Sequence, residues 1–277
     1  FRHSYMTLPI EWIYLVVNER LFRPAQVYLY LKSICDGKIQ IQAELIDEIS
    51  QTLEVKTKRT VKTAIEKLIE LNWVGYNPKS KFYFIRSYKY VAGIYGFKRK
   101  TVAKFEIDYL VHLKAFLIGA IIEDLIRKQK RKYRKMLKKV PENLPKRMQL
   151  RAEQHKGSSF QPEEAFASFF LLANKALSRI LNISIQTAFE FKKLAQKHGF
   201  IVIHKNFKYL DISHKELWLY KKAIDKMDAV KVRVMPMGND RYVVYSQECD
   251  TVKSNVIFTY SKKIKSYNKG IFSKQPR

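Results

Sequence analysis

The apolar side chains between residues 24 and 87 change their spacing in a fixed order, and this order restricts the fold more than any other feature. Three segments carry apolar residues at helical spacing: 25–34, 43–53 and 58–72. Three short segments alternate instead and predict strands: 38–42, 73–76 and 81–85. Residues 77–80 form a tight-turn sequence between the last two. The predicted order is helix, strand, helix, turn, helix and a two-stranded hairpin.

This order resembles that of a winged helix-turn-helix domain. The resemblance depends on apolar residues at the spacing of two packed helices and a following strand: Leu45, Ile46, Ile49, Leu53, Val55, Val61, Ala64, Ile65, Leu68, Trp73 and Val74. It implies that the second helix of the motif enters the DNA major groove and that the hairpin forms a wing. The alternative is an ordinary helical hairpin followed by a β-hairpin, which has no reason to carry a basic second helix.

A second segment has a similar predicted order. Its expected elements are a helix, a turn, a helix and the two strands of a second wing: 174–181, 182–183, 184–198, 200–203 and 207–210. Ser184 suits an N-cap and Gly199 a C-cap. In this alignment Glu190 falls at the position of Ala64, an apolar residue of the first copy.

A long helix is expected between these modules, over residues 106–137. It ends in a run, 127–139, with nine basic residues and no acidic residue, and a polar linker follows over 141–159. Further expected elements are helices at 8–22, 162–172 and 215–227, and strands at 230–234, 241–245 and 255–260.

The predicted fold class is therefore α+β and mostly helical, with tandem winged-helix domains joined by a long helix and a small C-terminal β element. Four divisions are expected. An N-terminal winged-helix domain covers 1–100, and a basic connecting helix with its linker covers 101–159. A second winged-helix-like domain covers 160–228, and a β-rich extension with a basic tail covers 229–277.

The charge indicates a polyanionic partner. The chain has 53 Lys and Arg against 25 Asp and Glu, a formal net charge of +28, yet 47% of its residues are hydrophobic, which is enough for a core. Nucleic acid is the commonest such partner and an anionic membrane surface the second. The most apolar window, 109–126, includes two acidic residues, a lysine and a histidine, so we expect no membrane partner and a cytoplasmic, nucleoid-associated protein.

The sequence gives little support for an enzyme. It has no phosphate-binding P-loop motif, no paired histidines and no nucleophile elbow, and its two cysteines cannot form a Cys-rich zinc site. Asp240, Glu248 and Asp250 suggest a metal-dependent nuclease, and Tyr133 suggests a strand-transfer nucleophile. The motif behind each of these two hypotheses is weak. We expect no catalysis, no cofactor and no metal.

Candidate DNA-binding residues of the first module surround the start of its second helix and the wing tip. Arg or Lys there suits guanine O6 and N7, threonine hydroxyls suit phosphate oxygens, and the helix dipole favours phosphate at the same end. A solvated charge is the alternative for each lysine taken alone. The candidates are Lys56, Thr57, Lys58, Arg59, Thr60, Lys62, Thr63, Lys79, Ser80 and Lys81.

The second module offers a more polar set. Gln186 suits hydrogen bonds to adenine, and Glu190 suits the amino group of cytosine. The alternative is that Glu190 is an ordinary surface residue and that this module contacts protein. The candidates are Ser184, Gln186, Thr187, Lys193, His204, Lys205, Asn206 and Lys208.

The basic run after the long helix supplies a third group of candidates. It is expected to follow the DNA backbone between the modules; a solvated helix end and contact with anionic lipid are the alternatives. The candidates are Arg127, Lys128, Lys130, Arg131, Lys132 and Arg134.

Two winged-helix modules in one chain resemble the layout of plasmid and phage replication initiators. The resemblance implies sequence-specific binding of double-stranded DNA at an origin, host replication proteins as partners, and a homodimer. A transcriptional regulator, and a structural DNA-binding adaptor in a larger nucleoprotein complex, are the alternative functions.

Overall fold

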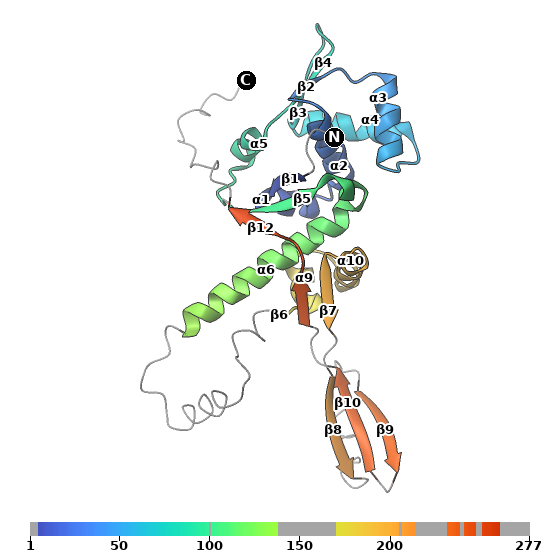
Figure 1. The fold of residues 1–277 in the computed structure, drawn as a ribbon, viewed down its shortest axis with the longest axis vertical. Helices are drawn as coiled ribbons and strands as arrows, with labels where there is room; N and C mark the ends of the chain where they lie inside the picture. Colours follow the sequence, from blue (N-terminus) through green and yellow to red (C-terminus); the bar gives the residue numbers. More distant parts are fainter. Residues whose placement is uncertain are drawn as a thin grey trace. The chain divides into compact units, whose positions relative to one another are not determined.

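A computed structural model describes residues 5–99, 101–137, 170–204, 207–213, 232–238, 241–247 and 251–260 (Figure 1). The fold is α+β, and more of these residues lie in helices than in strands. The described residues form two compact units that alternate along the chain. The first contains the residues up to Gln129, Phe189–Ile201 and those from Ser254 onward, and the second contains the intervening ones. The four-part division expected from the sequence stays a prediction.

The first unit opens with a strand that the sequence analysis missed. β1 (Tyr5–Pro9) precedes α1 (Ile10–Asn18), so the helix expected over 8–22 begins and ends inside that range. β1 pairs antiparallel with β5 (Thr101–Glu106), and β5 also pairs with β12 (Phe258–Tyr260). These partners are far apart in sequence, so no local pattern identifies the sheet.

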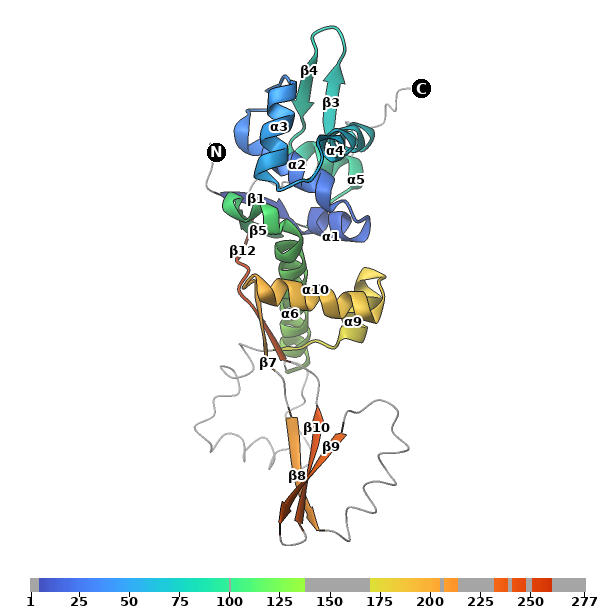
Figure 2. The ribbon, with the colours of Figure 1, turned by 90° about the vertical axis from the view of Figure 1, so that its right-hand side faces the viewer.

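The elements expected between residues 24 and 87 are confirmed. They are α2 (Phe22–Ile34), β2 (Lys38–Ile39), α3 (Ala43–Thr52), α4 (Lys58–Glu70), β3 (Val74–Asn77) and β4 (Phe82–Ile85). The three strands form one sheet in the order β2-β4-β3, and α5 (Tyr88–Tyr95) follows it. Figure 2 shows the β3–β4 hairpin extending past α3 and α4.

Two faces of α4 have opposite character. Val61, Ala64, Ile65 and Leu68 are buried, whereas the intervening side chains are exposed. An aromatic cluster supports the end of this helix: the Trp73 ring lies 5.5 Å from Trp12 and 5.3 Å from Tyr28. The Trp73 amide donates to the Leu68 carbonyl (2.9 Å), so the cluster fixes the corner between α4 and β3.

The long helix begins later than the sequence indicates. Residues 101–106 form β5, a 3₁₀ helix η1 (Ile107–His112) follows, and α6 (Leu113–Leu137) starts only there. A helix over 106–137 is therefore wrong in its first two turns. The expected apolar stripe is confirmed, because Leu113, Leu117, Ile121 and Leu125 are all buried.

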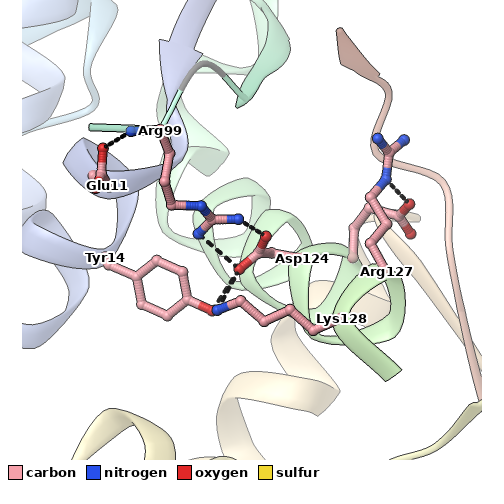
Figure 3. A network of polar contacts seen from close by, with 7 residues as sticks. Glu11, Tyr14, Arg99, Asp124, Arg127 and Lys128 are labelled. Carbon is pink, nitrogen blue, oxygen red and sulfur yellow. Dashed lines mark hydrogen bonds and ion pairs between the residues drawn. The ribbon is translucent and has the colours of Figure 1, made fainter. Parts of the chain in front are cut away.

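A buried ionic cluster ties α6 to α1 and to the segment before β5 (Figure 3). The Asp124 carboxylate, 2% exposed, pairs with the Arg99 guanidinium and with the Lys128 ammonium (2.9 Å). It also accepts a hydrogen bond from the Tyr14 hydroxyl (3.1 Å), and Glu11 accepts one from the Arg99 amide (2.7 Å). These contacts orient the helix around a buried carboxylate whose basic partners, Arg99 and Lys128, stay partly exposed.

Gly119 of α6 allows a close approach of the chain. A Cβ at this position would lie 2.8 Å from the Phe200 Cβ and 3.2 Å from a Val256 methyl. We therefore expect Gly119→Val to lower the free energy of unfolding by about 2–3 kcal/mol, because overpacking forces these elements apart. Urea denaturation measures it. Gln129→Val on the exposed face of α6 controls for the helix propensity of valine; equal losses in the two variants would contradict this packing explanation.

The helices of the second predicted module are confirmed. After β6 (Phe170–Leu171) come α9 (Asn174–Leu181) and α10 (Ile185–Lys197). Ser184 caps α10, its Oγ accepting from the Thr187 amide (3.0 Å), and Gly199 has a φ of +75° beyond the helix. Phe170 and Leu171, expected in a helix over 162–172, form a strand instead; residues 162–169 lie outside the described residues.

The second predicted wing is wrong. β7 (Ile201–His204) belongs to a sheet of order β6-β11-β7 with β11 (Thr251–Ser254). β8 (Phe207–Ser213) pairs along its length with β10 (Arg241–Gln247). Each strand has a partner from the C-terminal quarter of the chain, so the two do not form the expected hairpin with each other.

The C-terminal strands are confirmed in part. β9 (Val232–Gly238) pairs antiparallel with β10, so the hairpin expected from 230–234 and 241–245 exists. The strand expected over 255–260 is present only at 258–260, as β12, and β11, at 251–254, is a further strand in a different sheet. The helix expected over 215–227 lies outside the described residues.

Candidate nucleic-acid interface

The turn between α3 and α4 is closed by paired hydrogen bonds. The Val55 amide donates to the Ser50 carbonyl (2.8 Å), and the Ser50 hydroxyl donates to the Val55 carbonyl (2.9 Å). Glu54, between them, has a φ of +49°. The hydroxyls of Thr57 and Thr60 then meet at 2.8 Å across the first turn of α4. These local bonds fix the direction in which α4 leaves the turn.

The turn between α9 and α10 repeats this geometry. The Ile183 amide donates to the Ser178 carbonyl (3.0 Å), and the Ser178 hydroxyl donates to the Ile183 carbonyl (2.7 Å). Asn182 has a φ of +50°, as Glu54 does. The hydroxyls of Ser184 and Thr187 also lie 2.8 Å apart. The chain thus builds the same helix-turn-helix junction twice.

Matching Thr57 with Ser184 shifts the sequence alignment of the two helices by one residue. The buried positions of α4 then correspond to the buried positions of α10, which are Ala188, Phe191, Lys192 and Ala195. Glu190 corresponds to Thr63, and both are exposed. The alignment of Glu190 with Ala64 is therefore wrong, because the second turn has one residue fewer before its helix starts.

The exposed side of α4 and the turn before it carry three cations without an acidic partner in the part of the chain that the structure describes. Lys56, Arg59 and Lys62 are exposed, and within the described ranges no carboxylate forms an ion pair with them. Lys58 differs, because its ammonium lies 2.6 Å from the Asp47 carboxylate in an exposed pair. Exposed pairs contribute only about 0–1 kcal/mol, so Lys58 can exchange Asp47 for another anion at small cost.

A shallow groove of about 400 Å³ follows the same helix face. Three threonine hydroxyls and three cations border it, and none of its lining residues is acidic: Arg23, Pro24, Thr57, Arg59, Thr60, Thr63, Ala64 and Lys67. Lys67 pairs with Glu70 (2.7 Å), so it is partly neutralised. Arg23 was missed by sequence reasoning, since it lies on α2 and only the packing of α2 against α4 brings it here.

The tip of the β3–β4 hairpin, the candidate wing, is a tight turn with exposed basic side chains. The Asn77 Oδ1 accepts hydrogen bonds from the amides of Lys79 (3.0 Å) and Ser80 (3.4 Å). Lys79, Ser80 and Lys81 are exposed, and Lys81 has a φ of +53°. Behind the tip, the rings of Tyr76 and Tyr83 lie 4.7 Å apart, which stiffens the hairpin.

A wing that contacts DNA predicts that Lys79→Ala combined with Lys81→Gly weakens duplex binding about 5- to 10-fold and reduces its salt dependence, because two expected phosphate contacts would be removed. Glycine is chosen at position 81 because it adopts positive φ without strain. Fluorescence anisotropy measures the affinity and a thermal melt serves as the control. Unchanged affinity in a variant that melts at the wild-type temperature would contradict a wing contact.

The basic run contributes fewer free cations than its sequence indicates. The Arg127 guanidinium pairs with Glu123 (2.7 Å), and Lys128 pairs with the buried Asp124 (Figure 3). Lys130 and Arg131 also have interaction partners. Lys132 and Arg134 lie in the part of α6 of which only the backbone is described. The i, i+4 spacing of Glu123 with Arg127 and of Asp124 with Lys128 was a sequence signal for these pairs.

The candidate residues of α10 sit on a surface of different chemistry. Gln186, Glu190 and Lys193 are exposed, as expected, and Gln186 and Glu190 have partners. The positions of Lys58 and Lys62 are taken by Ile185 and Phe189, which are 52% and 47% exposed. His204 ends β7, Lys208 lies in β8 with only its backbone described, and Lys205 and Asn206 lie outside the described residues.

The described residues contain no cluster of three or more His, Cys, Asp or Glu side chains that could hold a metal ion. Asp240, Glu248 and Asp250 lie outside them. No helix within the described part of the chain is long and apolar enough to span a membrane. Comparisons with protein-family models, curated proteins and solved structures each gave no significant match.

Proposed function

We propose that this chain binds double-stranded DNA through a winged helix-turn-helix in its first unit, with α4 as the recognition helix and the β3–β4 turn as the wing. One observation carries the proposal. α4 is buried on one face, and its opposite face presents Arg59 and Lys62 without carboxylate partners among the described residues. A DNA major groove accepts one helix, and its phosphates would neutralise these charges.

The residue types on α4 suit both parts of a DNA contact. Arg59 can donate two hydrogen bonds to guanine O6 and N7, and Lys62 can pair with a phosphate. The groove beside them adds the hydroxyls of Thr60 and Thr63 and the guanidinium of Arg23. Backbone contacts would set the orientation of α4, and Arg59 would read sequence.

The second helix-turn-helix is proposed as a reading element of different specificity. Its junction has the same hydrogen bonds as the first, but its outer face replaces two lysines by Ile185 and Phe189. Apolar side chains contact the thymine methyl group, and Gln186 suits adenine. The same exposed apolar pair also favours an alternative function, in which α10 contacts a protein partner and the chain is a structural adaptor in a nucleoprotein complex.

The biological role that we propose is replication initiation at the origin of a plasmid, phage or mobile element, as the two-module layout suggests. A transcriptional regulator would use the same elements. The proposal assigns no catalytic step, cofactor or metal to the chain.

The test is selection of bound duplexes from a random DNA pool at low and high salt, with the full chain. We expect an enriched motif that persists at high salt, because base contacts lose less affinity with salt than phosphate contacts do. Paired motifs near repeats of the native element would favour an initiator, and a single motif near a promoter would favour a regulator. Absence of any enriched motif would contradict sequence-specific binding and favour the adaptor.

A further inference from the structure

A second basic pocket, of about 440 Å³, lies within the first unit at the start of α2. The connection from α1 to α2, the η1–α6 junction and α10 each contribute to its wall. Its charged and titratable residues are Arg20, Arg23, His112, Lys114 and His198. None of its lining residues is acidic, so the pocket concentrates positive charge.

Two of the three permanent cations of this pocket, Arg23 and Lys114, are held by neutral groups, and Arg20 is exposed. The Lys114 ammonium lies 5.2 Å from the centre of the Phe22 ring and 4.9 Å from that of Phe191. Arg23 donates to the Leu53 carbonyl (3.3 Å). Among the described residues, no carboxylate pairs with Arg20, Arg23 or Lys114. The charges of Arg23 and Lys114 are therefore positioned but not neutralised, as in a site that binds an anion, and Arg20 adds an exposed charge.

Two imidazoles complete the pocket. The rings of His112 and His198 are stacked with centroids 4.0 Å apart and an interplanar angle of 27°. Burial lowers the pKa of His198, and the charges of His112 and Lys197 lower it further. Protonation of His198 would add a donor to the pocket, and it would be favoured once an anion is bound.

This pocket adjoins the face proposed to bind DNA. Arg23 lines both the pocket and the groove along α4, which also contains Arg59 and Thr60. A polyanion that binds in the groove could therefore extend past Arg23 to Lys114 and Arg20, which have no carboxylate partner among the described residues.

We propose that this pocket is an oxyanion site that binds a backbone phosphate of the DNA flanking the bases read by α4. The inference rests on the proposed function, and it extends the DNA contact from α4 to the η1–α6 junction. Free phosphate offers the same oxyanion, so the experiment must separate the two sources.

The first measurement is the salt dependence of DNA binding by the full-length Lys114→Met variant. Methionine keeps the aliphatic packing on Phe22 and Phe191 but removes the charge. We expect an affinity loss of about tenfold and a log–log salt slope reduced by roughly 0.9, the value for one phosphate. Lys98→Met, at an exposed lysine of the same unit outside both pockets, is the matched control and should leave the slope unchanged. Arg20→Gly, at a φ of +56°, provides a second variant without backbone strain.

The second measurement is an NMR titration of His112 and His198 in the wild-type chain. Facing these rings are Arg20 and Arg23 from the α1–α2 segment, Lys114 from α6 and Lys197 from α10. Duplex DNA should raise the pKa of His198, and binding should accordingly tighten as the pH falls from 8 to 6. Lys114→Met should reduce this rise.

The outcomes separate this proposal from the proposed function. One outcome would overturn the pocket assignment alone. In it, Lys114→Met and Arg20→Gly both keep the wild-type salt slope of DNA binding, while substitution of Arg59 and Lys62 abolishes binding. A His198 titration moved by inorganic phosphate and not by DNA would overturn the DNA-backbone source. If every α4 variant bound DNA as tightly as the wild type, the proposed function itself would be overturned.

Discussion

Replacing Lys58, Arg59 and Lys62 together by alanine is expected to weaken binding to a selected duplex by two to three orders of magnitude. Each of these side chains has an exposed charge on one face of α4, and Arg59 and Lys62 have no carboxylate partner among the described residues. A charge-assisted hydrogen bond contributes about 1.5 kcal/mol, and Lys58 contributes less because it must leave Asp47, so the three contacts together amount to roughly 4 kcal/mol. Anisotropy titration at several salt concentrations measures the loss and the change in slope.

The control for this variant removes the same net charge elsewhere. Lys265, Lys269 and Lys274 come from the basic C-terminal segment, and their replacement by alanine lowers the formal charge equally. If general attraction dominated, both triple variants would lose similar affinity. Equal losses would therefore rule out α4 as the recognition helix, whereas a much larger loss for the α4 variant supports it. Circular dichroism should show that both variants remain folded, because the three α4 side chains are exposed.

Replacing Asp124 by asparagine is expected to lower the free energy of unfolding by about 3 kcal/mol. Asp124 is 2% exposed and is the shared partner of Arg99, Lys128 and the Tyr14 hydroxyl (Figure 3). Removing one member of a buried pair leaves the other charges without compensation. Urea denaturation at pH 7 measures the loss. Glu123→Gln, which alters the neighbouring carboxylate that pairs with Arg127, should cost about 1 kcal/mol or less.

The stability difference between wild type and Asp124→Asn should depend on pH. Burial by itself would raise the pKa of Asp124, but hydrogen bonds and charges from Arg99 and Lys128 outweigh it and hold the pKa below its ordinary value. A lowered folded-state pKa means that the contribution is complete above the unfolded pKa of about 4 and is lost as the pH falls through the folded-state pKa. The two chains should therefore converge in stability in acid. A difference that is constant from pH 7 to pH 2 would show that the charge of Asp124 is not responsible.

Local patterns determined most of the elements around the candidate site. The apolar spacing of α3 and α4, the turn at 77–80 and the cap at Ser184 involve residues within a few positions of one another, so sequence alone located them. The same spacing predicted the exposed cations of α4. The i, i+4 pairing of Lys128 with Asp124 is equally local, and it reduces the unpaired positive charge of the basic run.

The sequence by itself therefore determined α2, α3, α4, α9 and α10, the first hairpin and the basic character of α4, because helical periodicity, caps and turns are properties of short segments. Only the tertiary structure decided which strands pair and which cations converge. β8 pairs with β10 residues that lie 28 to 40 positions away, and β7 pairs with β11, more than 40 positions away. Arg23 reaches the α4 groove from another helix. Such contacts depend on packing between distant segments, for which one sequence carries no local signal.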